Sequence, residues 1–237
     1  MLNRFRCRQR EPELMDQPGL GEPLHRAALA GLGRINRFSG SGRILWQALE
    51  RRIATNATRT WRLLDLASGG GDVAIDVARR AARAGARVLV DGCDVSPFAV
   101  RYATARASER QVENVQFFRQ DVLNAPLPEG YDVVMCSLFL HHLDDETAVA
   151  LLSKMAAVAK KLVVVNDLRR STFGYLLAWF GCRLLSRSPV VHVDGPRSVQ
   201  AAFSIAELRG VAQRSGLGTA LLQSSWPCRM LLQWRPA

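Results

Sequence analysis

The chain has 237 residues, 48% of them hydrophobic and 22% charged, which suits one α/β domain with additions and excludes two large domains. The same composition argues against intrinsic disorder. No apolar run approaches the roughly 20 residues that a membrane-spanning helix needs. Residues 1–10 are rich in arginine and lack the apolar stretch of a secretory signal. We therefore expect one globular core and a cytoplasmic location.

The net charge of +11 raises the question of nucleic-acid binding, which requires basic residues clustered on one face. Here they are scattered, and arginine outnumbers lysine 29 to 3 among the 32 basic residues, a bias typical of GC-rich coding sequence. Solvated arginine faces are the simpler interpretation, and RNA methylation stays open as an alternative. The five cysteines are widely spaced and contain no C-x-x-C pair, which predicts reduced, mostly buried thiols and no zinc site.

The N-terminal 60 residues differ in pattern from the rest of the chain. Prolines and glycines interrupt the polar stretch 1–23, which predicts a mobile or loosely docked arm. Apolar residues then recur at helical spacing over 24–38 and 44–53, so we expect two helices ahead of the first strand.

Strands and helices alternate from residue 62 onward. Strands are predicted over 62–66, 87–92, 114–119, 131–138 and 162–166, and helices over 72–84, 97–109 and 146–159. Ser96 is a suitable N-cap for the second helix, with Pro97 in its first turn. This rhythm implies right-handed βαβ units and a parallel sheet covered on both faces.

The C-terminal part departs from this rhythm. We expect a helix over 171–186, a loop over 187–198 that contains Pro189, Gly195 and Pro196, and a second helix over 205–215 that ends at Gly216. Two apolar segments, 217–222 and 229–234, are joined by a short connection, which favours an antiparallel strand pair. The sheet is then mixed at one edge.

The motif with the clearest chemistry is the turn after the first strand. Three glycines, Gly69 to Gly71, separate a strand pattern from a helix pattern, and such a turn exposes backbone N–H groups to a ligand. Acids follow three successive strands, at Asp65, Asp94 and Asp121, although one such acid alone is often only a helix cap. Ligands of open α/β sheets bind at these strand ends.

Two ligands compete for this turn. The sequence of residues 69–74 satisfies G-x-G-x-x-A, and Asp94 lies where a dinucleotide-binding protein places its ribose-binding acid. Asp65 argues against a dinucleotide, because a carboxylate at the end of the first strand repels a pyrophosphate. A cationic ligand is favoured by that carboxylate, and Asp121 suits a ligand with an amine donor.

The chain resembles the class I S-adenosylmethionine-dependent methyltransferases. Four motifs carry the resemblance in order, at residues 65–71, 94–97, 120–122, and 131–134 with 140–143, so that it covers about 62–166. The antiparallel C-terminal pair matches the family's seven-stranded sheet. One departure is Ala67, where the family usually has glycine, and alanine fits there if its φ is negative.

The resemblance implies a role for each matching residue. The methionine part of S-adenosylmethionine would be held by Asp65, Ala67, Ser68, Gly69 and Gly71. Asp94 would bind both ribose hydroxyls, Asp121 the adenine amine, and the main chain near Ser137 would close over the sulfonium. Val95 and Val122 would lie on either side of the adenine ring.

Methyl transfer needs alignment in a dry pocket and, for a weakly acidic nucleophile, a base. His141 and His142 follow the fourth strand and are candidate bases, although they could also only shape the pocket. Residues 144–146 are expected to favour the next helix's N-terminus rather than to bind a metal. Asp167 and Arg169, after the fifth strand, are candidate substrate contacts, with a helix cap and a solvated arginine as the alternative.

The sequence thus predicts a doubly wound, Rossmann-like α/β fold with a mostly parallel seven-stranded sheet and an antiparallel C-terminal strand. Residues 1–60 form an arm and cap helices, and 61–237 the methyltransferase domain, with a helical lid insertion at about 168–204. The predicted activity is methyl transfer to an oxygen or carbon of a small apolar or aromatic acceptor, quinone-, phenol- or polyketide-like. Alternatives are an NAD-dependent oxidoreductase and a cofactor-binding regulator. Arg183 and Arg187, beside an apolar helix face, also suggest contact with a membrane surface.

Overall fold

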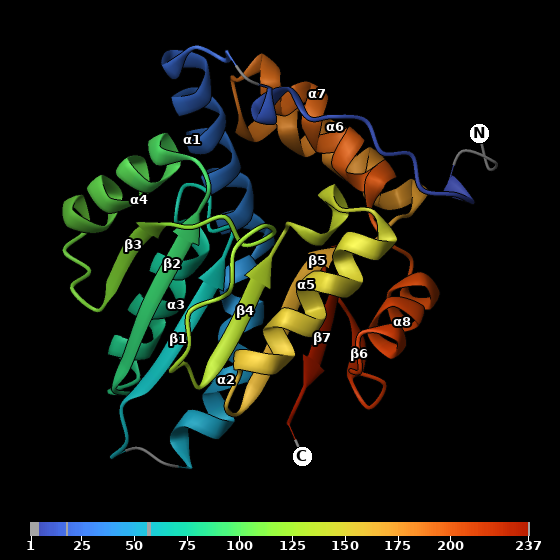
Figure 1. Ribbon diagram of the computed structural model, residues 1–237. Helices are drawn as coiled ribbons and strands as arrows, with labels where there is room; N and C mark the ends of the chain where they lie inside the picture. Colours follow the sequence, from blue (N-terminus) through green and yellow to red (C-terminus); the bar gives the residue numbers. More distant parts are fainter. Residues whose placement is uncertain (1–4, 18, 56–57, 237) are drawn as a thin grey trace.

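The computed structural model describes residues 5–17, 19–55 and 58–236. Residues 1–4 and Pro18, which belong to the predicted arm, lie outside the described residues, as does residue 237. One seven-stranded sheet runs through the molecule in the order β3-β2-β1-β4-β5-β7-β6 (Figure 1). Its strands are β1 (Trp61–Leu66), β2 (Val88–Asp94), β3 (Val115–Arg119), β4 (Val133–Ser137), β5 (Leu162–Leu168), β6 (Leu221–Ser225) and β7 (Arg229–Trp234).

The strand directions confirm the predicted mixed sheet. β1 pairs in parallel with both β2 and β4, and β4 pairs in parallel with β5. β7 runs antiparallel to β5 and to β6. The strand order reverses between β1 and β4, and such a switch point opens a crevice beyond the carboxyl ends of the strands.

Helices cover both faces of the sheet, and further helices lie over the carboxyl ends of its parallel strands. They are α1 (Glu22–Ser39), α2 (Ser41–Ala54), α3 (Asp72–Arg83), α4 (Pro97–Glu109), α5 (Asp145–Val158), α6 (Thr172–Leu185), α7 (Pro189–Ala201) and α8 (Ile205–Arg214). On one face, Leu49 of α2 and Ile75 of α3 are buried in a common cluster with sheet residues. On the other, Leu151 of α5 and Leu208 of α8 are buried in a second cluster. The predicted doubly wound architecture is therefore confirmed (Figure 1).

Side-chain caps explain where several helices begin. Ser96 accepts a hydrogen bond from the Ala99 N–H at 3.2 Å, as the sequence predicted. Asp144 accepts one from the Thr147 N–H at 2.8 Å, so the acidic run at this position serves the start of α5. α8 begins with a reciprocal capping box between Ser204 and Glu207.

The prediction of a loop over 187–198 is wrong, because this segment forms α7. Pro189 sits in the first turn, where a missing N–H costs nothing, but Pro196 lies inside the helix and removes one backbone bond. Tertiary packing compensates for that loss. Gly195 allows a close approach to α6, since a Cβ there would lie 2.2 Å from the Cys182 sulfur, and Val191 is buried beneath.

The strand predicted over 217–222 is also misplaced, because β6 spans Leu221–Ser225. Leu217 is fully buried, and its N–H donates to the Ala212 carbonyl at the end of α8. Its apolar character therefore reflects packing under α8 and not membership of a strand. The other predicted strands and helices agree with the structure within about two residues at most ends, the usual uncertainty of such boundaries.

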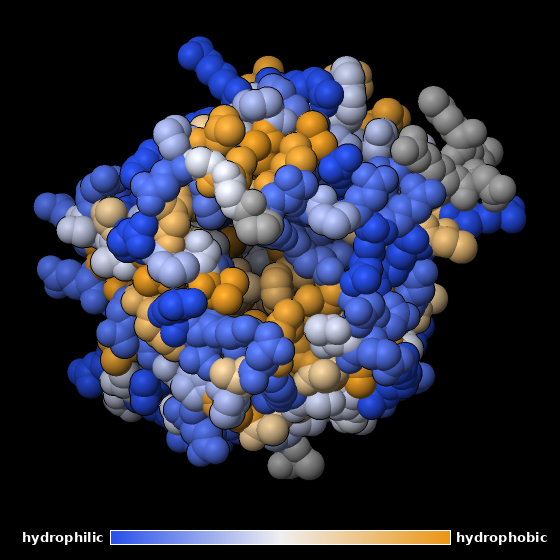
Figure 2. Space-filling model, turned by 45° about the horizontal axis from the view of Figure 1, so that its top comes forward, coloured by the Kyte–Doolittle hydropathy of each residue, from blue (hydrophilic) through white to orange (hydrophobic). Residues whose placement is uncertain are grey.

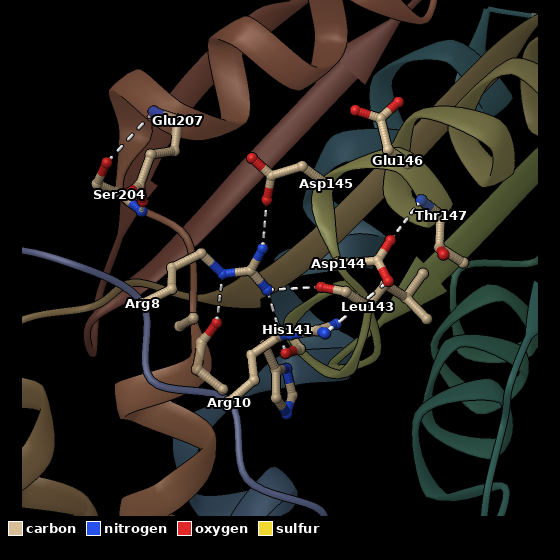
Figure 3. A network of polar contacts seen from close by, with 12 residues as sticks. Arg8, Arg10, His141, Leu143, Asp144, Asp145, Glu146, Thr147, Ser204 and Glu207 are labelled. Atoms are coloured by element: carbon tan, nitrogen blue, oxygen red, sulfur yellow. Dashed lines mark hydrogen bonds and ion pairs between the residues drawn. The ribbon is translucent and has the colours of Figure 1, made fainter.

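The described part of the N-terminal arm, 5–17, is firmly docked, which corrects the prediction of a mobile or loose arm. The Arg8 guanidinium donates to the Leu143 carbonyl at 2.7 Å, to the Asp145 carboxylate at 2.8 Å and to the Ala201 carbonyl at 2.8 Å (Figure 3). It also lies 3.5 Å from the centre of the Phe203 ring. Arg8 thus ties the arm to the start of α5 and the end of α7.

Three helices and the arm form a cover over the carboxyl ends of the parallel strands. Ala28 of α1, Cys182 of α6 and Val191 of α7 share a small buried cluster, against which Leu14 and Met15 of the arm pack. In Figure 1 this layer lies above the sheet. Among the described residues, no helix is both long enough and apolar enough to cross a membrane.

The turn between β1 and α3 contains one unfavourable backbone conformation. Ala67 has φ 51°, so the condition under which alanine fits the family's glycine position, a negative φ, is not met. An L-residue in the left-handed region brings its Cβ close to a carbonyl oxygen, which costs about 1–2 kcal/mol. Gly69 and Gly71, with φ 52° and 70°, adopt the same region without that penalty.

We expect Ala67→Gly to raise the free energy of unfolding by about 1 kcal/mol, because glycine removes the steric cost at φ 51°. Urea denaturation measures the change. Ala105→Gly on the exposed face of α4 is the matched control, and it should lower the same quantity by about 1 kcal/mol. A destabilised Ala67→Gly variant would contradict the assignment of strain to this residue.

Candidate functional site

A cavity of about 1000 Å³ lies between the carboxyl ends of the strands and the helical cover. The molecule is hollowed near the centre of this face, and hydrophobic residues border much of the opening (Figure 2). Its walls come from the arm, α1, α6, α7, the β1–α3 turn, the ends of β2 to β5 and the β6–β7 connection. The cavity is thus built from segments that are distant in sequence.

The glycine turn forms the floor of the cavity, as predicted. Ala67, Ser68 and Gly69 line it, and nothing lies within 4 Å of the position that a Cβ on Gly69 would occupy. Gly71 does not line the cavity. A Cβ there would lie 2.6 Å from the Phe117 ring, so Gly71 serves the packing of the turn against the sheet.

Asp65 is the most unusual group in the cavity wall. Its side chain is 1% exposed, and its Oδ1 is buried without a hydrogen-bond partner among the described residues. Burial, together with the nearby carboxylates of Asp72 and Asp94, raises the pKa of Asp65 well above its ordinary range. A desolvated carboxyl group without a cationic neighbour is a site suited to an ammonium or another cationic ligand group.

Asp94 lies at the end of β2 and also lines the cavity. Its Oδ2 accepts a hydrogen bond from the Gly69 N–H at 2.8 Å, and its Oδ1 accepts one from the Ser96 N–H at 2.9 Å. These bonds fix the orientation of the carboxylate and connect it to the glycine turn. Each oxygen keeps a lone pair, so the group can still accept hydrogen bonds from two vicinal hydroxyls.

Asp121, Val95 and Val122 line the same end of the cavity. Val95 is 55% exposed and Val122 5% exposed, so one apolar wall is open and the other is part of the core. Asp121 accepts hydrogen bonds from the N–H groups of Leu123 and Asn124 at 3.0 and 3.1 Å. It therefore caps its own turn, as the simpler interpretation of a strand-end acid expects, while it also faces the cavity.

Ser137 ends β4 and lines the cavity beside the glycine turn. Its hydroxyl accepts a hydrogen bond from the Asn166 side chain at 3.0 Å. Asn166 is fully buried, and its Oδ1 is without a partner among the described residues. Asn166 does not itself line the cavity, so it acts on the cavity wall by orienting the Ser137 hydroxyl.

His141 is held between two carboxylates. Its ring Nδ1 lies 2.7 Å from the Asp167 Oδ1, and its ring Nε2 lies 3.6 Å from the Glu13 Oε1. The backbone N–H of His141 donates to the Asp167 Oδ2 at 3.1 Å. Burial lowers the pKa of the imidazole, but Asp167 and Glu13 outweigh that effect and raise it to about 10. The ring is therefore an imidazolium at neutral pH and is not free to accept a proton.

His142 has a different environment. Its side chain is 19% exposed, and it lines the cavity beside Phe139, with ring centres 5.8 Å apart. Its Nδ1 lies 3.1 Å from the Asp16 carboxylate, and its Nε2 lies 3.7 Å from the Glu13 Oε1. Asp16 thus orients the ring, in the way that a carboxylate fixes the tautomer of a catalytic histidine.

The two predicted substrate contacts, Asp167 near the end of β5 and Arg169 directly after it, do not line the cavity. Asp167 is 2% exposed and uses its carboxylate for His141. Arg169 donates to the Ser224 hydroxyl of β6 at 3.2 Å. Asp167 is not the helix cap of the alternative interpretation either, because Ser171 caps α6 and the Asp167 carboxylate pairs with His141.

Several cavity residues carried no recognisable sequence signal. They are Glu13 and Asp16 of the arm, His25 of α1, and Arg229 at the start of β7. The two arm acids lie in a polar stretch, more than a hundred residues from the histidines that they contact. Arg229 could have been noticed as a charge that opens an otherwise apolar strand.

Known proteins resemble this chain in the region of the site. Residues 63–161 match the family described as Methyltransferase domain. A demethylmenaquinone methyltransferase of Thermus thermophilus is 37% identical over 107 residues, which cover 44% of this chain and 46% of that protein. A ubiquinone biosynthesis O-methyltransferase of Albidiferax ferrireducens is 31% identical over 122 residues, which cover 51% and 46%. The chain thus spans about half the length of these curated relatives.

A solved structure agrees over a longer stretch. The magnesium protoporphyrin IX methyltransferase of Synechocystis PCC 6803, with bound SAH, covers 100% of this chain and 94% of its own at a TM-score of 0.59 and 18% identity. At that identity the likeness supports the fold. These matches favour the methyltransferase prediction over the NAD-dependent oxidoreductase that the sequence left open. The motifs, the sheet order and the match over residues 63–161 agree in indicating, in this part of the chain, a methyltransferase domain similar to those of the class I S-adenosylmethionine-dependent methyltransferases.

Proposed function

We propose that this protein is an S-adenosylmethionine-dependent methyltransferase that acts on an oxygen or carbon of a small apolar or aromatic acceptor. The observation that carries the proposal is the buried, unpaired carboxyl group of Asp65 at the glycine turn, with Asp94 fixed on the neighbouring strand. Relatives named for ubiquinone and menaquinone synthesis support a quinone- or phenol-like acceptor. A polyketide-like aromatic acceptor has the same chemical character.

The wall of the cavity fits the cofactor at each end. Asp65 offers its free oxygen to the ammonium of the methionine part, and the open space above Gly69 admits the chain. Asp94 would accept hydrogen bonds from the ribose hydroxyls, and Val95 and Val122 would flank the adenine beside Asp121. When bound, S-adenosylmethionine supplies a methyl group on a sulfonium that a nucleophile removes by direct displacement.

The rest of the cavity suits an apolar acceptor. Leu29 and Leu32 of α1, Phe139 after β4 and Leu177 of α6 line it. We propose that residues 1–60 and about 168–204 act together as the substrate cover of the 61–237 domain. The contacts between α1, α6 and α7 support this division, since they exclude water from the space above the strands.

We propose different roles for the two histidines. His142 lines the cavity and keeps Nε2 available near Glu13, so it is the candidate base for a phenolic or enolic proton. His141, held as an imidazolium by Asp167 and Glu13, is a positioning residue that joins the arm to β5. Asp167 and Arg169 are not included among the proposed substrate contacts.

We also propose a peripheral contact with membranes, since a quinone-like acceptor dissolves in lipid. α6 exposes Phe173, Phe180 and Leu184 by 55%, 63% and 85%, and Trp226 lies 6.1 Å from the Phe173 ring. The exposed guanidinium of Arg183 is close to this apolar face. Such a combination of apolar and basic groups is typical of helices that lie at a bilayer surface. The free cysteines, four of them buried, support a cytoplasmic location.

Cofactor binding tests the function. Asp94→Asn keeps the shape of the side chain and removes its charge, so we expect the Kd for S-adenosylhomocysteine to rise by about tenfold or more in calorimetry. Asp76→Asn on the outer side of α3 is the control and should leave that Kd unchanged. Titration with NADH should give no heat of binding. A wild-type protein that binds NADH and not S-adenosylhomocysteine would overturn the proposal.

The two histidines are expected to differ in both activity and stability. His142→Gln should lower turnover of a phenol or quinol by at least about 100-fold without changing the Kd for S-adenosylhomocysteine. The raised pKa of His141 contributes stability that is complete below its unfolded value of about 6.5 and is lost as the pH rises towards about 10. Urea unfolding should therefore show the advantage of wild type over His141→Gln shrinking across that range, with the pH dependence retained in His142→Gln. If His141→Gln lost turnover and His142→Gln lost the pH dependence of unfolding, His141 would be the base and His142 the positioning residue.

Membrane contact is tested by sedimentation with vesicles of phosphatidylethanolamine and phosphatidylglycerol. Replacement of Phe180 and Leu184 by serine should lower the bound fraction by about tenfold, because it removes apolar area that the bilayer would bury. Leu89→Ser, at a 47% exposed position of β2, is the control. If wild type, the Phe180 and Leu184 serine variant and Leu89→Ser sedimented equally with the vesicles, the proposed membrane contact would be rejected.

A further inference from the structure

Arg229 is a buried charge in the wall of the cavity. It is the first residue of β7, and because β7 runs antiparallel to β5, its start lies at the same edge as the ends of the parallel strands. The residue is 4% exposed and lines the cavity. Neither the proposed cofactor contacts nor the candidate base involves it.

The guanidinium of Arg229 is mostly unpaired. Its Nη2 donates to the Ser39 hydroxyl at 2.9 Å, whereas its Nε and Nη1 have no acceptor within the described ranges. Those two nitrogens carry three N–H groups. Burial lowers the pKa of Arg229 to about 10, which leaves it charged at neutral pH. A buried cation with unused donors is costly unless a ligand satisfies it.

The acids near Arg229 do not neutralise it. Asp167 acts on it only at a distance, and its carboxylate is used by His141 at 2.7 Å. Asp72 is also nearby, but its Oδ2 has no hydrogen-bond partner in the described part of the chain. No described carboxylate forms an ion pair with Arg229, so its positive charge can interact with a ligand in the cavity.

We propose that Arg229 binds a carboxylate group of a ligand inside the cavity, an inference that rests on the proposed methyltransferase function. A planar guanidinium with several free donors is suited to a carboxylate. The carboxyl groups of Asp65, Asp72 and Asp94 line the same cavity, so a single negative charge is accepted more readily than the double charge of a phosphate.

The strand order indicates which ligand carries this carboxylate. β4 and β5 lie between β1 and β7, so at about 4.8 Å per strand the backbone at the start of β7 is ~14 Å from the end of β1, and the Arg229 side chain reaches from there towards Ser39. The amino-acid end of the cofactor would lie at that turn, on Asp65. Arg229 therefore belongs to the acceptor's side of the cavity, and the acceptor is an aromatic or apolar acid.

Two pairs of probes test this assignment by calorimetry. In protein saturated with S-adenosylhomocysteine, wild type should bind 3,4-dihydroxybenzoate at least about tenfold more tightly than catechol, which lacks only the carboxylate. Arg229→Met should abolish that preference and leave the Kd for S-adenosylhomocysteine unchanged. Arg229→Lys should keep part of the preference, and Arg80→Met on the surface of α3 should keep all of it.

Each contrary result has a distinct meaning. No preference for the acid in wild type would overturn the inference. If Arg229→Met weakened S-adenosylhomocysteine and spared 5′-methylthioadenosine, which lacks the amino-acid part, the carboxylate would be the cofactor's and the acceptor assignment would fail. If wild type bound no S-adenosylhomocysteine at all, the proposed function itself would fail. Circular dichroism of each variant checks that a lost preference is not lost folding, and Arg229→Lys carries the test if Arg229→Met unfolds.

Discussion

The buried ion cluster of His141, Asp167 and Glu13 connects the parts of this molecule that the chain order keeps apart. Asp167 at the end of β5 holds the imidazolium from below, and Glu13 reaches it from the arm. Because an unpaired charge at this depth would be costly, the three groups are mutually dependent. The arm, η3 (Leu140–His142) and the sheet edge are thereby fixed in one arrangement, and the cavity beneath them has a defined roof.

The polar groups left unsatisfied in that cavity are unevenly distributed. Asp65 and Asp72 each present a buried oxygen without a donor among the described residues, and Arg229 presents donors without an acceptor there. Buried polar atoms in folded proteins are nearly always paired, so this concentration in one wall is a sign of ligand binding. The oxygens suit a cation with N–H donors, and the arginine suits an acid. The wall is therefore complementary to ligand groups of both charges, as the proposed cofactor and the proposed acid acceptor require.

Much of the site was predictable because its residues lie at strand ends. Asp65, Asp94, Asp121 and Ser137 each follow a strand that the hydrophobic pattern identifies, and all of them line the cavity. The failures have a common origin in contacts between distant segments. α7 forms despite Pro196 because it packs on α6 and α1, and the arm is ordered because Arg8 and Glu13 find partners around residues 141–145 and 201. Local propensity carries no information on either.

The sequence by itself determined the fold class, the order of strands and helices, and the strand-end residues that line one end of the cavity, since periodicity and turn residues are local properties. It also named both histidines. Only the tertiary structure decided that His141 is clamped between two carboxylates while the more exposed His142 lies beside it in the cavity wall, that the Asp167 carboxylate contacts His141, and that Ala67 adopts φ 51°. These outcomes depend on burial and on contacts between charged residues that are far apart in the chain, such as Glu13 and His141. Local sequence patterns carry no information on such contacts.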